Sequence, residues 1–172
     1  MKKWIILVLT LLALTGCAEK TFETVTDTVE HQQMPQQRQV VLQLPAEAVT
    51  PTIQSEQAGA LYLCDGYTMT LHTVQAGDIE NTFRQTTGFS KDALTVLEYR
   101  QGDQKRYECV WTCAGEGTDQ IGKAAIISDG AYHYVLSVMA DADTAGALWE
   151  TWKTLFASFQ TVSADTVLNT GS

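Results

Sequence analysis

Short turns that each contain a glycine divide the middle of this chain into pairs of strand-like segments. The turns are Asp65-Gly66, Gln101-Gly102-Asp103-Gln104 and Asp129-Gly130. Glycine accepts the positive φ angles that a two-residue hairpin turn requires, and aspartate is a common neighbour in such turns. Each turn therefore predicts a β-hairpin, and successive hairpins build an antiparallel sheet.

The segments on either side of these turns are rich in Val, Ile, Leu, Thr and aromatic residues. The three predicted hairpins are Ala60–Cys64 with Tyr67–Val74, Ala93–Arg100 with Lys105–Ala114, and Ile121–Ser128 with Ala131–Ala140. Gln39–Leu44 adds a further strand that ends at Pro45, because proline cannot donate to a strand ladder. We therefore expect about six or seven strands.

Two segments have the pattern of helices. In the first, Gly77–Gly88, Asp78 can cap the N-terminus and Gly88 suits the left-handed residue that ends a helix. In the second, roughly from Asp143 to Phe159, apolar residues recur at spacings of three and four. They are Leu148, Trp149, Trp152, Leu155, Phe156 and Phe159. We expect this long C-terminal helix to pack on the sheet.

These elements predict an α+β fold: an antiparallel meander sheet of about six or seven strands, one short helix, and a long C-terminal helix packed on the sheet. This order of elements, which closes on Leu155-Phe156-Ala157-Ser158-Phe159, resembles the PsbP-like fold. The resemblance covers Val40–Phe159 at the level of pattern. It implies a binding or assembly role, as in many small bacterial lipoproteins, and it transfers no catalytic residue.

The N-terminal residues, MKKWIILVLTLLALTGC, have the parts of a secretory signal. The apolar run Trp4–Leu14, as a helix at about 1.5 Å per residue, would reach only about half of a ~30 Å hydrocarbon core. Leu14-Thr15-Gly16-Cys17 closely resembles the lipobox of bacterial lipoproteins. That resemblance implies cleavage after Gly16, a diacylglyceryl group on Cys17, and a location on the outer face of the bacterial cytoplasmic membrane. The alternative is an ordinary secretory signal with a chance cysteine.

Composition completes the predicted organisation. We expect a signal peptide over 1–16, a lipidated cysteine and polar tether over 17–38, a single α+β domain over 39–160 and a flexible polar tail over 161–172. Removing Lys2 and Lys3 leaves 9 basic residues against 20 acidic ones, a formal charge of −11. This balance argues against nucleic acid as a partner and against electrostatic docking on anionic lipid, because both select Lys and Arg. No second apolar run approaches 18 residues, so the predicted membrane contact is the lipid on Cys17.

His72 and His133 are the candidates for catalysis or metal binding, because both fall on predicted strands. Either imidazole together with Asp65 or Asp129 would suit zinc, yet no spacing in the sequence requires it. The sequence also has no Gly-x-Ser-x-Gly, His-Glu-x-x-His or phosphate-loop motif. We therefore expect no catalytic set, no metal and no cofactor. The alternative is a small metal-dependent or acid–base enzyme that uses His72 or His133.

Past Cys17 the chain has three cysteines, in a compartment where disulfides persist. Cys109 and Cys113 lie on one predicted strand, about 13 Å apart at ~3.3 Å per residue, whereas a disulfide needs Cα atoms within about 7 Å. We therefore predict a disulfide from Cys64 to Cys109, in preference to Cys113. The alternatives are three buried thiols, or a Cys-x3-Cys metal pair formed by Cys109 and Cys113.

Aromatic residues on the strands and the C-terminal helix are expected in the core, because they bury large apolar areas. They are Tyr107, Trp111, Tyr132, Tyr134, Trp149 and Trp152. The alternative for the strand aromatics is an exposed platform that binds carbohydrate or peptide.

Together these features predict a non-enzymatic, membrane-anchored binding or assembly module. Such a module would present a sheet face or hairpin edge to an envelope protein or a small ligand. A structural envelope protein without a small ligand is a further alternative.

Overall fold

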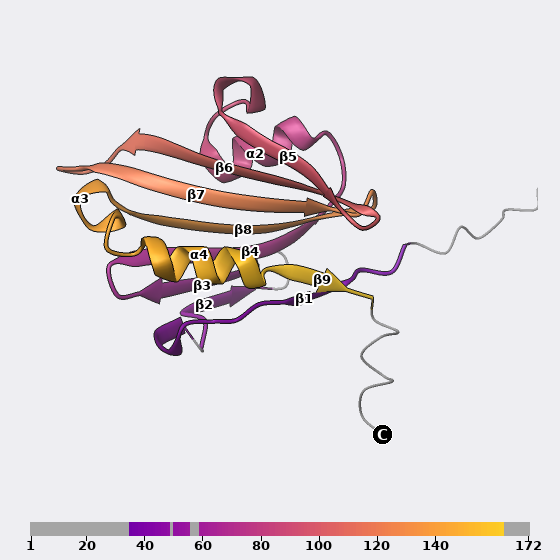
Figure 1. Ribbon diagram of the computed structural model, residues 1–172, viewed down its shortest axis with the longest axis horizontal. Coiled ribbons are helices and arrows are strands. Elements are labelled where there is room, and N and C mark those ends of the chain that lie inside the picture. Colours follow the sequence, from indigo (N-terminus) through magenta and orange to yellow (C-terminus); the bar gives the residue numbers. More distant parts are fainter. Residues whose placement is uncertain (1–34, 49, 56–58, 164–172) are drawn as a thin grey trace, which may run out of the picture. The chain divides into compact units, whose positions relative to one another are not determined.

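The computed structural model describes residues 35–48, 50–55 and 59–163 (Figure 1). The strands are β1 (Gln39–Val41), β2 (Ile53–Ser55), β3 (Gly59–Cys64), β4 (Tyr67–Gln75), β5 (Val96–Gln101), β6 (Gln104–Ala114), β7 (Asp119–Ser128), β8 (Tyr132–Asp141) and β9 (Gln160–Val162). The helices are α2 (Ile79–Thr87), α3 (Ala142–Ala145) and α4 (Trp149–Ser158), with 3-10 turns η1 (Ala46–Ala48) and η2 (Lys91–Ala93). In these residues we find no helix with the length and hydropathy of a membrane span.

Seven strands form one antiparallel sheet in the order β2-β3-β4-β8-β7-β6-β5. The sheet consists of two meanders, β2–β4 and β5–β8, whose last strands pair with each other from Thr68 opposite Met139 to Gln75 opposite Tyr132. As a result, β5 lies at one edge of the sheet and β2 at the other (Figure 1). β1 and β9 form a separate two-stranded sheet.

The three predicted hairpins are confirmed at their predicted turns. Gln101, for example, pairs with Gln104 around Gly102-Asp103. Gly66, Gly102 and Gly130, one in each turn, all have positive φ angles. Residues with a side chain adopt this backbone region only at a cost, so local sequence alone is enough to position these turns.

The predicted first helix is also confirmed, and it covers one face of the sheet. The Asp78 carboxylate accepts the N–H of Glu80 at 3.0 Å, and Gly88 ends α2 with a φ of 81°. Phe83 is fully buried and packs edge-on against Tyr107, with 6.0 Å between ring centroids. We call this side of the sheet the α2 face.

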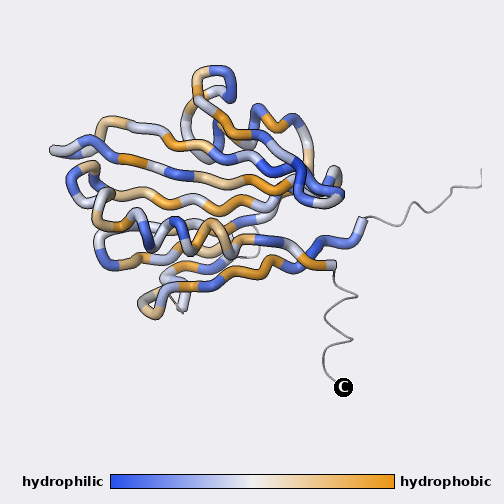
Figure 2. The backbone as a smooth tube through the Cα atoms, in the orientation of Figure 1, coloured by the Kyte–Doolittle hydropathy of each residue, from blue (hydrophilic) through white to orange (hydrophobic). Residues whose placement is uncertain are grey.

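The opposite side of the sheet, the α4 face, is covered by α4 and the segment that follows it (Figure 1). Trp152 and Leu155 of α4 are buried in one core with Met69 and Leu136 of the sheet. The interior strand β7 is covered on both faces, so its residues 124–127 are all buried. In Figure 2, apolar residues follow these strands, whereas the hairpin turns are hydrophilic.

The predicted α+β fold, with one sheet of about six or seven strands and a long C-terminal helix, is wrong, because the described chain is mostly β, with nine strands in two sheets, and its helices are short. The helix expected over Asp143–Phe159 is split into α3 and α4. Between them, the Ala147 N–H donates to Thr144 and the Leu148 N–H to Ala145, at 3.0 and 3.2 Å. These i→i+3 bonds form tight turns in place of an α-helix. Gly146 lies at the break, and glycine disfavours a helix by roughly 1 kcal/mol relative to alanine.

The break also changes which residues of the expected apolar stripe are buried. Trp149, expected in the core, is 49% exposed, whereas Trp152 is 1% exposed. Phe159 is buried but lies beyond α4, in extended backbone that leads into β9. β9 takes in residues 161–162 of the expected tail. The remainder of that tail from residue 164, the signal peptide and most of the tether lie outside the described residues.

Candidate functional site

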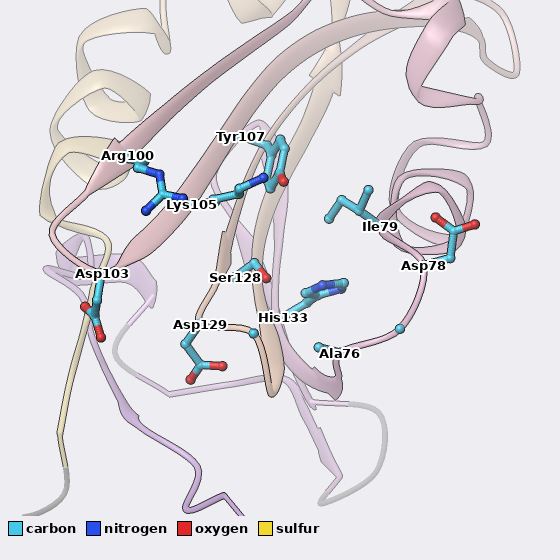
Figure 3. A pocket seen from close by; sticks show the side chains of 12 residues that line it. Ala76, Asp78, Ile79, Arg100, Asp103, Lys105, Tyr107, Ser128, Asp129 and His133 are labelled. Carbon is cyan, nitrogen blue, oxygen red and sulfur yellow. The ribbon is translucent and has the colours of Figure 1, made fainter.

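An open pocket of about 540 Å³ lies at one end of the sheet, where the β5–β6 turn, the β7–β8 turn and the start of α2 come together (Figure 3). We call it the turn pocket. Its polar lining residues are Asp78, Arg100, Asp103, Lys105, Tyr107, Ser128, Asp129 and His133. The pocket therefore contains His133 and Asp129, which the sequence singles out for metal binding or acid–base chemistry.

His133 belongs to the core rather than to the open part of this pocket. It is 3% exposed, and its ring Nδ1 lies 2.7 Å from the Thr82 hydroxyl on α2. Burial lowers the pKa of His133 from its usual 6.5, because the imidazolium form loses its hydration, and the nearby Asp129 opposes this only in part. His133 thus links β8 to α2 through Thr82.

Asp129 closes the β7–β8 turn. One carboxylate oxygen accepts the N–H groups of Ala131 and Tyr132 at 2.9 and 2.7 Å, and the other accepts the Tyr134 hydroxyl at 2.8 Å. Arg38 Nε lies 3.7 Å from the second oxygen. These donors occupy both oxygens of the carboxylate. Asp129 therefore stabilises the β7–β8 turn and contacts the segment before β1 that carries Arg38.

Arg100 and Lys105 are the cations of the turn pocket, and they lie directly opposite each other across the β5–β6 hairpin. Both side chains extend toward the pocket in Figure 3. Lys105 Nζ lies 3.6 Å from Glu98 Oε1, whereas Arg100 has no hydrogen bond or ion pair with another described residue. Because Arg100 has no such partner, it is available to an acidic group from outside the described chain. An acidic group there would be favourable, since like charges directly opposite each other destabilise a sheet.

His72 lies on the α2 face as well, yet it lines a different pocket. The register of β4 and β8 makes His72 and His133 diagonal neighbours on adjacent strands. His72 lines a pocket of about 310 Å³ at the last turn of α2, where the Thr70 and Ser137 hydroxyls lie 2.5 Å apart. Burial lowers the pKa of His72 too.

The acidic partners considered for a zinc site lie at opposite ends of β4. Asp65 is in the turn before that strand, whereas Asp129 is beside its other end, where Gln75 pairs with Tyr132. Within the described ranges, no three His, Cys, Asp or Glu side chains are grouped as metal ligands.

The structure does not bring Cys64 and Cys109 together. Cys64 packs toward the α4 face, whereas Cys109 is buried under α2 on the other face. Three strands lie between β3 and β6, so at ~4.8 Å per strand the two cysteines are about 19 Å apart, far beyond the ~7 Å limit of a disulfide. Cys109 and Cys113 are free thiols, and burial raises the pKa of Cys109 to about 11. Cys17 lies outside the described residues.

No protein-family model and no curated protein matches this chain. Its function therefore has to be inferred from the geometry of its surface. We consider β5, one of the two edge strands of the sheet in the described part of the chain. Leu97 of β5 is 61% exposed, Val110 of β6 is 45% exposed, and Tyr99 is exposed as well. We call these three residues the β5 patch.

The β5 patch lies on the part of the α4 face that α4 leaves open. Leu97 and Tyr99 are opposite Glu108 and Arg106, and Arg106 donates to the Phe156 carbonyl of α4, so Leu97 and Tyr99 point to that face. Leu97 and Val110 line an apolar groove of about 310 Å³ together with Lys123. The Lys123 ammonium lies 5.3 Å from the ring centroid of Trp149, which places this groove beside α4.

The hairpin pattern predicts β5 but not its position at the edge. That position depends on the pairing of β4 with β8, which no local pattern encodes. One signal was present in the sequence: Leu97 and Tyr99 alternate with Glu98 and Arg100. A strand in the middle of a sheet that is covered on both faces would be apolar on both.

Proposed function

We propose that this protein is a lipid-anchored, non-enzymatic binding or assembly module on the outer face of the bacterial cytoplasmic membrane. The observation that carries the proposal is the β5 edge, where exposed Leu97 and Tyr99 flank backbone that has no further strand beside it in the described chain. Native proteins usually protect such edges, because open N–H and C=O groups next to apolar side chains recruit another chain. An edge of this kind binds an extended segment as an added strand.

The N-terminal sequence supports the anchoring part of the proposal. Leu14-Thr15-Gly16-Cys17 follows a basic start and a short apolar run, as in bacterial lipoproteins. A diacylglyceryl group on Cys17 would supply two acyl chains, and two chains hold a protein stably on a membrane where one does not. A polar tether of about 20 residues would let the domain stand off by tens of ångströms.

The contacts in the turn pocket argue against an acid–base role for His133. A general base must reach the proton that it removes from a substrate. His133 is buried and engaged with Thr82, and the Asp129 carboxylate accepts hydrogen bonds from its own turn and strand. Both residues therefore have structural roles.

Photo-crosslinking of the full chain in its native cells tests the proposal. A photoreactive residue in place of Leu97 should capture a protein, whereas one in place of Leu63, which is 57% exposed on β3, should not. Cys17→Ala should abolish the incorporation of labelled fatty acid. Capture from position 63 alone, or undiminished labelling of the Cys17→Ala variant, would contradict the proposal.

A further inference from the structure

We propose that the occupant of the β5 edge is a second copy of this protein, paired antiparallel through β5 with Tyr99 opposite Tyr99 of the second copy. The inference rests on the proposed binding role of this edge and names the partner. A two-fold axis at Tyr99 makes the contact isologous, as in most dimers. It joins two seven-stranded sheets into one continuous sheet.

The β5–β6 turn determines which backbone groups of β5 face the open edge. Gln101 and Gln104 flank this two-residue turn, in which Gly102 has a φ of 65°. The residues that flank such a turn form a hydrogen-bonded pair, and hydrogen-bonded and non-hydrogen-bonded pairs alternate along an antiparallel ladder. The outward-facing N–H and C=O groups of β5 are therefore those of Val96, Glu98 and Arg100.

Only registers that place outward-facing residues opposite one another can form a ladder with a second β5. A register centred on Glu98 or on Arg100 sets like charges directly opposite, which disfavours pairing. Registers centred nearer the ends of β5 pair fewer residues. The register centred on Tyr99 sets Glu98 opposite Arg100, and the two-fold axis makes this ion pair twice. Charge complementarity thus selects one register among those that the backbone allows.

The second copy supplies the acidic group that Arg100 lacks. Within the described residues, Arg100 faces Lys105 across the hairpin and has no ion-pair partner. Glu98 accepts a hydrogen bond from Lys91 Nζ at 2.9 Å, which lowers the pKa of its carboxyl group and keeps it charged at neutral pH. In the paired register, this carboxylate lies beside the Arg100–Lys105 pair of the other copy and relieves its repulsion.

The same register covers apolar surface on the other side of β5. Leu97 and Tyr99 point to the α4 face, where both are exposed. In the dimer, Tyr99 lies against Tyr99 of the second copy, and Leu97 is its diagonal neighbour. The Tyr99 hydroxyl donates to Glu108 Oε1 at 2.9 Å, so the ring is already oriented along the strand face before pairing.

Disulfide trapping tests the contact in the full-length chain, processed in its own cells. In the proposed register, residue 99 forms a non-hydrogen-bonded pair, whose Cα atoms lie about 4.5 Å apart and within disulfide range. Tyr99→Cys should therefore give a covalent dimer under a mild oxidant. Leu63→Cys, at a more exposed position on β3, is the control and should stay monomeric.

Charge reversal tests the register. Glu98→Arg and Arg100→Glu, each combined with Tyr99→Cys, should lower the dimer yield roughly tenfold, which corresponds to about 1.4 kcal/mol. Produced together in one cell, the two variants should recover the yield as a heterodimer, because opposite charges then face each other in both pairs. Thermal melting of each variant verifies that the domain remains folded.

Three results would overturn the inference. They are no covalent dimer from Tyr99→Cys, a yield that neither charge reversal changes, and no recovery when the two variants are produced together. If Tyr99→Cys stays monomeric while position 97 captures a different protein, the proposed binding function stands and the second copy is the wrong partner.

Discussion

Arg106 of β6 connects the sheet to the end of α4, and its replacement should weaken the fold strongly. The residue is 3% exposed. Its Nη1 and Nη2 donate to the carbonyl oxygens of Phe159 and Phe156 at 2.6 and 2.7 Å, and its Nε donates to Glu108 Oε1 at 2.9 Å. The last carbonyls of a helix carry partial negative charge and have no partner within the helix. Phe156 carries one such carbonyl in the last turn of α4, and Phe159 directly follows the helix, so Arg106 holds the end of α4 against the sheet.

Arg106→Met keeps most of the apolar stem and removes all three hydrogen bonds. Each hydrogen bond to a charged group contributes about 1.5–3 kcal/mol, although the variant no longer has to desolvate a guanidinium. Glu108 keeps Lys123 as a weaker partner, with its Nζ at 3.9 Å. We therefore expect a net loss of about 3–5 kcal/mol, a large part of the ~5–15 kcal/mol stability of an ordinary domain.

Urea denaturation followed by tryptophan fluorescence measures this loss. With an m value of ~2 kcal/mol/M, the midpoint should fall by about 2 M at unchanged m. Arg84→Met is the matched control, because Arg84 forms an exposed ion pair with Glu80 at 3.0 Å, and it should shift the midpoint by less than about 0.3 M. Equal midpoints for the two variants would refute the role assigned to Arg106.

Two further predictions concern the core and its dependence on pH. Trp152→Ala should cost about 3–5 kcal/mol in a thermal melt because the ring is buried, whereas Trp149→Ala should cost less than about 1 kcal/mol, since its half-exposed ring mainly loses Lys123. Burial lowers the pKa of His133 below 6.5 in the folded state, so its contribution to stability is complete above pH 6.5 and is lost as the pH falls through the folded pKa. Between about pH 7.5 and about pH 5, the urea midpoint of His133→Gln should therefore fall less steeply than that of the unsubstituted protein. The same dependence of the midpoint on pH in both proteins would show that another group titrates.

The elements predicted correctly from the sequence are those that depend on neighbouring residues. Gly66, Gly102 and Gly130 take the positive φ angles that define the hairpin turns, whatever the remainder of the chain does. Asp78 and Gly88 likewise act within one turn of α2, through a side-chain cap and a left-handed backbone. Such interactions span a few residues, so their energies are visible in the local sequence.

The C-terminal helix is the element that the local sequence predicts incorrectly. The apolar spacing around Trp152 is real, yet it predicts neither the break at Gly146 nor the exposure of Trp149. A stripe of apolar residues shows that a segment needs a partner surface. It does not show where that surface ends. Here α4 ends before Phe159, and the strand that follows, β9, pairs with β1.

The sequence by itself thus determined the hairpins and the first helix, while the lipoprotein signal that its start resembles stays a prediction. Only the tertiary structure decided which elements became neighbours. The pairing of β4 with β8 joins residues as far apart as Thr70 and Ser137, and it sends β5 to the edge and separates Cys64 from Cys109 by three strands. It is tertiary packing, too, that buries Arg106, although a charged strand residue normally faces water. Alternation along a strand reveals two faces, but what covers each face depends on contacts between distant segments, whose energies exist only once the whole domain is assembled.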